Sequence, residues 1–194
     1  HPDHLSLYSL TLKNNSYAGY VNSLYTNEYF DKYYKFAVEF LGKNNFVQYE
    51  ISNFSKSGKF KSRHNLNYWN AEPYLGIGPG AFGADNLHRY QNYKNISKYT
   101  ERVNKRMFPY ADVDNLDARK KQNEFIFLNM RKIDGINIRR FNGLFNKDFE
   151  NNFEKLLNNY KKYFIYKNIK NEKHITLNTM GFLKYNTIMS EFFQ

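Results

Sequence analysis

Three consecutive segments near the start of the chain switch from a strand pattern to a helix pattern and back, and this order constrains the fold most. Residues 4–12 and 46–51 carry apolar side chains at alternate positions, as β-strands do. Between them, Asn27 can cap a helix that runs to about Lys43, with aromatic and aliphatic residues at helical spacing. A strand–helix–strand order predicts parallel strand pairing in an α/β fold.

The first predicted strand is apolar on both faces, with Leu5 and Leu7 on one face and Leu10 and Leu12 on the other. Strands buried on two sides are typical of parallel sheets that other layers cover. Such a strand needs neighbours, and nothing before it in the chain supplies one. We therefore expect a fragment whose N-terminal part is missing.

The second half of the chain changes character and predicts helices and a hairpin. The helices are expected over residues 112–132, 138–145, 149–160 and 178–193. Two short alternating runs, 163–166 and 174–177, flank a polar tip and predict the hairpin. Helices followed by a hairpin and a last helix resemble a winged helix, so we place a domain boundary near residues 107–112.

The composition limits the chemistry that the chain can perform. There is no cysteine, which excludes disulfides, zinc–thiolate sites, thiol nucleophiles and an iron–sulfur cluster held by this chain alone. No apolar run reaches the roughly 18 residues of a membrane helix, and the first residues form no secretory signal, so we expect a cytoplasmic protein without a membrane span. The net charge of +11 allows a nucleic-acid partner, but heavy use of Lys, Asn, Tyr and Phe throughout favours a compositional bias.

The segment from Arg63 to Trp69 groups the residue types that a porphyrin site needs. His64 can ligate iron and Arg63 can pair with a propionate, while Tyr68 and Trp69 can cover the macrocycle. The alternative is a hydrogen-bonded structural histidine, which is the commoner role of a lone His. The other histidines do not form a metal set by spacing.

Four glycines between Gly76 and Gly83 match neither the dinucleotide-binding pattern nor a P-loop. They allow positive φ or a close ligand approach, and a tight turn without a ligand is an equal alternative. Glu50 ends the second predicted strand, a usual position for a polar group at a barrel mouth. It has no second carboxylate nearby in sequence, so an acid–base role cannot be argued.

Three motifs, at residues 49–54, 63–69 and 74–81, together resemble one family. It comprises the radical S-adenosylmethionine (SAM) proteins similar to oxygen-independent coproporphyrinogen III oxidase, in particular the heme-chaperone, HemW-like branch. The resemblance implies an α/β fold: the C-terminal strands of a partial (β/α)6, TIM-like barrel over residues 1–108, then a helical, winged-helix-like domain over 109–194.

The resemblance also implies the ligands and partners. His64 corresponds to the family's proposed heme contact, with Arg63, Asn65, Tyr68 and Trp69 around it, and Thr11 would lie near SAM. The expected partners are heme, a heme-accepting apoprotein and the missing N-terminal half of the barrel.

The chain departs from the family pattern at three places. The cysteine triad that holds the [4Fe–4S] cluster is absent, Phe82-Gly83 replaces the usual His-Ser, and residues 13–15 replace Glu-Pro-Gly. The cluster and most of the SAM site would therefore belong to the intact protein, and this chain alone cannot perform radical chemistry.

Three functions remain open. The first is the C-terminal part of a heme chaperone, which would bind heme for transfer to an apo-acceptor, and the second is a coproporphyrinogen III oxidase of porphyrin biosynthesis. The third is a DNA-binding winged helix in which Arg139 and Arg140 contact phosphates. The motif around His64 favours the first, and nucleic-acid binding is the weakest of the three.

Overall fold

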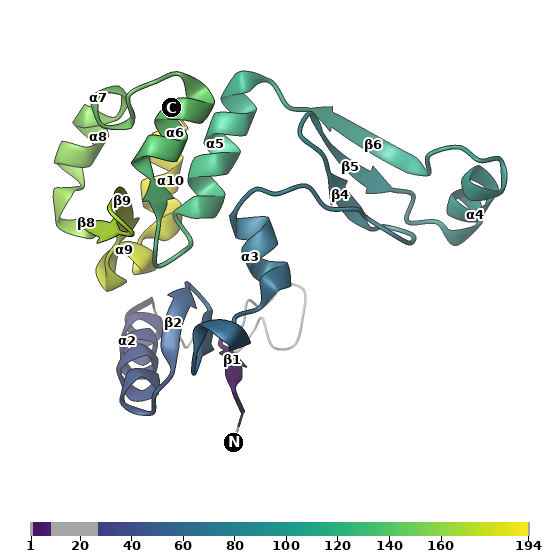
Figure 1. Cartoon of the computed structure of the whole chain (residues 1–194). Helices are drawn as coiled ribbons and strands as arrows, with labels where there is room; N and C mark the ends of the chain where they lie inside the picture. The colour runs from purple at the N-terminus through teal and green to yellow at the C-terminus, as the bar shows by residue number, and fades with distance from the viewer. Residues whose placement is uncertain (1, 9–26, 194) are drawn as a thin grey trace.

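The computed structural model describes residues 2–8 and 27–193, which form a mixed α/β fold (Figure 1). The strands are β1 (His4–Ser6), β2 (Val47–Glu50), β3 (Asn53–Ser55), β4 (Phe82–Ala84), β5 (His88–Asn92), β6 (Tyr110–Asn115), β7 (Ile136–Asn137), β8 (Phe164–Ile169) and β9 (Glu172–Leu177). The α-helices are α2 (Asn27–Lys43), α3 (Arg63–Trp69), α4 (Ile96–Asn104), α5 (Ala118–Asn129), α6 (Ile138–Phe145), α7 (Phe149–Asn152), α8 (Glu154–Asn159), α9 (Thr179–Leu183) and α10 (Tyr185–Phe192). Within the described ranges, no helix combines the length and the apolar composition that crossing a membrane requires.

The first sheet has the strand order β1–β3–β2, and both pairings are antiparallel. The prediction of parallel pairing is therefore wrong, because β3 lies between the two predicted strands. The Glu50 carboxylate accepts hydrogen bonds from the Ser52 backbone N–H (3.1 Å) and from the Asn53 side chain. These bonds hold the tight turn that sends the chain back beside β2.

Of the strand predicted over residues 4–12, the structure describes residues 4–8. Within these, only His4–Ser6 form a strand. Leu7 is 44% exposed, so this part of the chain is not covered on two sides. Leu10 and Leu12 lie outside the described residues. Ser6 donates a hydrogen bond to the Asn53 side-chain oxygen at 2.5 Å, which fixes β1 against β3.

Helix α2 has the predicted bounds, Asn27–Lys43. Tyr34 is buried, and its hydroxyl donates to the Ile51 carbonyl at 3.2 Å. Much of the predicted apolar face is nevertheless open: the aromatic side chains with 43–63% exposure are Phe30, Tyr33, Phe36 and Phe40. The helix therefore presents an aromatic surface that no described residue covers fully.

The second sheet, β4–β5–β6, and helix α4 project from the rest of the molecule (Figure 1). The sequence analysis predicted no helix or strand at the positions of β4, β5 and α4. Strand β6 overlaps the start of the helix predicted over 112–132. That helix begins only at Ala118, where Asp117 caps it by accepting from the Lys120 N–H at 2.7 Å. The helix prediction is therefore right only for its later part.

The third sheet, β7–β9–β8, packs with α5, α6 and α10 around the main core. Helix α6 has the predicted bounds, and β8 and β9 form the predicted hairpin. The other two predicted helices are each broken once, at Phe153 and at Lys184. The core includes Ile126, Met130, Ile136, Phe141, Phe149, Ile175 and Ile188, all fully buried.

Backbone hydrogen bonds join the first sheet to the segment that follows α5. The Ile51 N–H donates to the Arg131 carbonyl at 3.0 Å, and the Ile133 N–H donates to the Tyr49 carbonyl at 3.1 Å. These two bonds flank a bridge between Glu50 and Lys132. The end of β2 is therefore tied directly to the C-terminal half of the chain.

Candidate functional site

The motif around His64 folds as helix α3. Ser62 caps this helix, and its hydroxyl accepts a hydrogen bond from the Asn65 N–H at 3.2 Å. Arg63 and His64 follow immediately in the first turn and are exposed. The local sequence thus places an imidazole and a guanidinium in the first turn of an accessible helix.

His64 belongs to a short row of aromatic rings. Its ring meets the Tyr68 ring edge-on, with centroids 4.7 Å apart, and Tyr68 meets Tyr74 in the same way at 4.4 Å. Neither ring nitrogen of His64 has a hydrogen-bond partner among the described side chains and backbone groups. The packing therefore orients the imidazole while leaving its nitrogens available to a ligand.

Trp69 lies on a different face of α3 from His64, because five helical residues turn the chain to a position roughly 140° away. The Arg131 guanidinium lies over the Trp69 ring, 4.6 Å from its centroid, and 5.4 Å from that of Tyr185. The structure thus brings His64 and Tyr68 together and directs Trp69 toward the segment after α5.

The remaining predicted residues contribute less to the geometry. Arg63 forms no ion pair within residues 2–8 and 27–193, and Asn65 is half-buried behind the helix cap. Thr11 lies outside the described residues. Tyr74 is a neighbour that sequence reasoning did not single out, because it reaches Tyr68 only after the chain returns to pair with Ala84.

The glycine-rich loop is tied down by hydrogen bonds to its own unit. Gly76 N–H donates to the Tyr90 hydroxyl at 3.1 Å, Gly78 N–H to the Tyr99 hydroxyl at 3.2 Å, and Gly80 N–H to the Tyr93 carbonyl at 2.9 Å. Gly78 and Gly80 have φ of 103° and 72°, which favour glycine. Because these amide donors are occupied, the loop fits the tight-turn alternative better than a phosphate cradle.

Glu50, at the end of β2, is fully buried. One of its carboxylate oxygens has no hydrogen-bond partner in the described part of the chain. Burial raises the pKa of the Glu50 carboxyl, against the opposing effects of the hydrogen bonds from Asn53 and Ser52 and of the nearby Arg131. Burial also lowers the pKa of Lys132 to about 8, and its ammonium donates to the Asn70 side chain at 2.7 Å.

Replacing Glu50 with glutamine should make stability less sensitive to pH. A carboxyl whose pKa is higher in the folded chain binds its proton more tightly there, so the folded state loses stability as pH rises from the ordinary value of 4.5 through the raised pKa. Gln keeps the oxygen that accepts from Ser52. Urea unfolding between pH 4 and 8 should show that the free energy of unfolding of the variant increases relative to that of the parent as pH rises. The control is Glu39→Gln, on an exposed face of α2, which should show no such trend.

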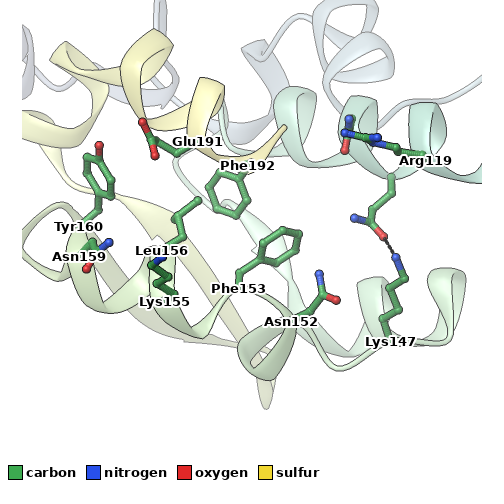
Figure 2. A pocket seen from close by; sticks show the side chains of 12 residues that line it. Arg119, Lys147, Asn152, Phe153, Lys155, Leu156, Asn159, Tyr160, Glu191 and Phe192 are labelled. Carbon is green, nitrogen blue, oxygen red and sulfur yellow. Dashed lines mark hydrogen bonds between the residues drawn. The ribbon is translucent and has the colours of Figure 1, made fainter. Parts of the chain in front are cut away.

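A polar hollow of about 420 Å³ lies between α5, α8 and α10 (Figure 2). Lys147 donates to the Gln122 side-chain oxygen across it at 2.7 Å, and Arg119 and Phe153 also line it. No predicted site residue lines this hollow.

The residues present do not fit an iron–sulfur cluster, because the chain contains no thiolate ligand. Within the described ranges, no group of three or more His, Asp or Glu side chains could hold a metal ion. Two other histidines are engaged elsewhere: His88 contacts the Asp85 carboxylate at 3.0 Å, and His174 contacts the Asp134 carbonyl at 3.1 Å. An accessible imidazole for iron already held by a porphyrin is therefore a better match than a bare metal site.

No family model matches the chain. Among curated proteins, the heme chaperone HemW of Bacillus subtilis is 36% identical over 110 residues, which cover 57% of this chain and 29% of that protein. HemW of Lactococcus lactis is 34% identical over 117 residues, 60% of this chain and 30% of that protein. The radical S-adenosyl methionine domain-containing protein 1 of Danio rerio is 39% identical over 87 residues, 42% of this chain and 19% of that protein.

Among solved structures, the radical SAM enzyme coproporphyrinogen III oxidase (HemN) of Escherichia coli superposes with a TM-score of 0.66. The match covers 98% of this chain and 48% of that enzyme, at 13% sequence identity, so it supports the fold alone. The chain matches less than a third of the length of the two HemW relatives. The chain therefore resembles the C-terminal part of the HemW chaperones in sequence and about half of the oxidase HemN in fold.

Proposed function

We propose that the protein to which this chain belongs is a heme chaperone, which binds heme in the cytoplasm and passes it to an apo-acceptor. The similarity to the HemW chaperones supports the class of function. The observation that carries the site is the exposed His64 imidazole, which Tyr68 orients and no described hydrogen bond occupies.

Heme is the cargo in this proposal, and each residue near His64 has a separate task. A ring nitrogen of His64 donates its lone pair to the iron, and the Arg63 guanidinium pairs with a propionate. The chain continues from Tyr74 into Leu75 and Ile77, which are 73% and 79% exposed and offer apolar surface for the macrocycle. Because the whole site is open, heme can leave it for an acceptor without a large rearrangement of α3.

We also propose the architecture that the family resemblance implies. Residues 1–108 would complete the last part of a radical SAM barrel, with Thr11 near SAM, and the intact protein would supply the [4Fe–4S] ligands. Residues 109–194 would form the winged-helix-like domain. The order α5, β7, α6, α7–α8 and the β8–β9 hairpin supports this assignment.

The two other functions have less support. The likeness to the oxidase HemN is one of fold at 13% identity. For DNA binding, Arg139 and Arg140 would need to meet phosphates, but they lie 3.8 Å and 3.4 Å from the carboxylates of Glu172 and Glu72. These acidic neighbours reduce the positive potential that a phosphate backbone would meet.

The proposal is tested by titrating the chain with hemin and following both the Soret band and the fluorescence of Trp69, the single tryptophan. Specific binding should shift the Soret band and quench Trp69 at about one hemin per chain. Heme-free globin added in excess should then remove the hemin. Hemin that binds without a saturation point, or that cannot be removed, would argue against a chaperone site.

Replacing Arg63 with alanine should weaken hemin binding by about 1–3 kcal/mol, the usual contribution of a charge-assisted hydrogen bond. Arg139→Ala is the matched control, because its side chain is 87% exposed on another helix. Soret titrations of both variants measure the difference. Equal affinities for the two variants would remove Arg63 from the site.

A further inference from the structure

A groove of about 850 Å³ runs between α2 and the junction of α9 with α10. Phe30, Tyr33 and Phe36 of α2 form one wall, and Tyr185 belongs to the opposite wall. The polar residues Ser52 and Arg131 also line the groove. The volume lies within the roughly 300–1,000 Å³ of small-molecule sites, and the combination of aromatic walls with a few polar groups is typical of them.

Arg131 gives the groove a positively charged anchor. Its guanidinium lies near the rings of Trp69 and Tyr185, which hold it in place without neutralising it. Among residues 2–8 and 27–193, no carboxylate lies within 4 Å of it, and its buried Nε has no hydrogen-bond acceptor. A buried donor without a partner costs free energy, and a ligand oxygen would recover it.

The charges around the groove do not supply the missing acceptor. Glu50 is a buried acid near Arg131, but its carboxylate accepts from Ser52 and Asn53, and within the described ranges no ion pair joins it to Arg131. Asp31 and Lys184 also line the groove, and their opposite charges offset one another. The Glu50 Oε2 and the Trp69 Nε1 are two further buried polar atoms without partners in the described part of the chain. Of these three residues, only Arg131 lines the groove.

We propose that this groove binds a small amphipathic carboxylate, whose carboxylate pairs with Arg131 and whose flat or elongated apolar body packs against the aromatic wall of α2. The planar guanidinium can bind a carboxylate through two parallel hydrogen bonds. This site goes beyond the proposed heme site, because it uses neither His64 nor iron.

The test compares an acid with its ester on the full chain. Protoporphyrin IX, which lacks iron and cannot be ligated by His64, is titrated by fluorescence beside its dimethyl ester. The parent should bind the acid at least tenfold more tightly, about the effect of one charge-assisted hydrogen bond. Because the acid could also pair with Arg63 at the proposed heme site, the titrations are made in the Arg63→Ala background. There, Arg131→Gln should remove this preference, and Arg139→Gln should retain it. Oleate and methyl oleate provide the same comparison for an elongated body, so the two arms identify the apolar part.

A second variant covers the case in which Arg131→Gln does not fold. Ala37 lines the groove from α2, and Ala37→Trp should fill the groove and abolish binding of both acids. Ala111→Trp, on the exposed strand β6, is the control and should bind like the parent.

Equal binding of acid and ester by the parent, or unchanged binding by Ala37→Trp, would overturn the proposal. A third contrary result would be that neither acid binds the parent and that the parent forms a dimer which Ala37→Trp dissociates. His64→Ala should leave protoporphyrin binding unchanged. Failure of the heme site and failure of the groove are therefore distinguishable.

Discussion

Replacing His64 with alanine should lower the affinity for hemin at least tenfold and remove the Soret shift that marks a nitrogen ligand. The substitution deletes the only iron ligand that the proposal names, and α3 should tolerate it because His64 is exposed and alanine is a strong helix former. Soret titration measures the affinity, and circular dichroism at matched concentration shows whether the fold is retained.

The control is His88→Ala, because His88 is also a solvent-accessible histidine, and within the described ranges its ring forms hydrogen bonds with Asp85 alone. His174 is less suitable, because it contacts the Asp134 carbonyl and the Asn137 side chain, which joins it to β7. Hemin also adsorbs to apolar surfaces, and the chain has 18 Tyr and 18 Phe. The difference between the two variants therefore matters more than binding itself, and identical titrations would make His64 a structural residue.

Replacing Gly135 with alanine should lower the free energy of unfolding by at least about 2 kcal/mol. Gly135 has a φ of 68°, and an added Cβ would collide with the Ile175 carbonyl oxygen and the Thr176 side chain of β9. Both are parts of the strand that pairs with β7, so the clash would disturb the centre of the third sheet.

Gly143→Ala is the matched control for this glycine. Gly143 lies inside α6, and a Cβ there meets no atom within 4 Å. Alanine at a helix interior position should raise the free energy of unfolding by about 0.5–1 kcal/mol. Urea unfolding followed by circular dichroism measures both variants, and equal midpoints would contradict the backbone arrangement around β7 and β9.

The elements that the sequence predicted well are those whose determinants lie within a few residues. Helix α6 begins after Asn137, whose side chain accepts from the Arg140 N–H at 2.8 Å, and ends at Asn146 in a left-handed conformation. The hairpin of β8 and β9 needs only alternation and the two left-handed residues Lys170 and Asn171. Caps and turns of this kind can be recognised from local sequence.

The elements that the sequence did not predict depend on distant partners. The strand β6 pairs with β5 across the whole of α4, and β3 is only three residues long and pairs on one side with the distant β1. Gly83 is required because the Tyr90 ring lies where its Cβ would be, which no local pattern reveals. Short strands with such contacts cannot be distinguished from irregular segments in a single sequence.

In the candidate site, too, local sequence predicted one part and distant contacts determine the other. His64 and Tyr68 are four residues apart, so helical spacing alone predicts that their rings meet. Arg131 reaches Trp69 from 62 positions along the chain, and only the assembled fold shows this contact. The sequence thus named His64, the proposed iron ligand, and one neighbouring ring, but not the cation beside the tryptophan.

The most direct test of the heme site is a nuclear magnetic resonance titration of the chain labelled with ¹⁵N at its five histidines. Ferric heme is paramagnetic, so the imidazole that binds the iron should lose its ring signals first. We predict that the His64 signals, assigned with His64→Ala, disappear before one equivalent of hemin while those of His4, His88 and His174 persist. His64 signals that remain at saturation, while those of another histidine are lost, would contradict the assignment.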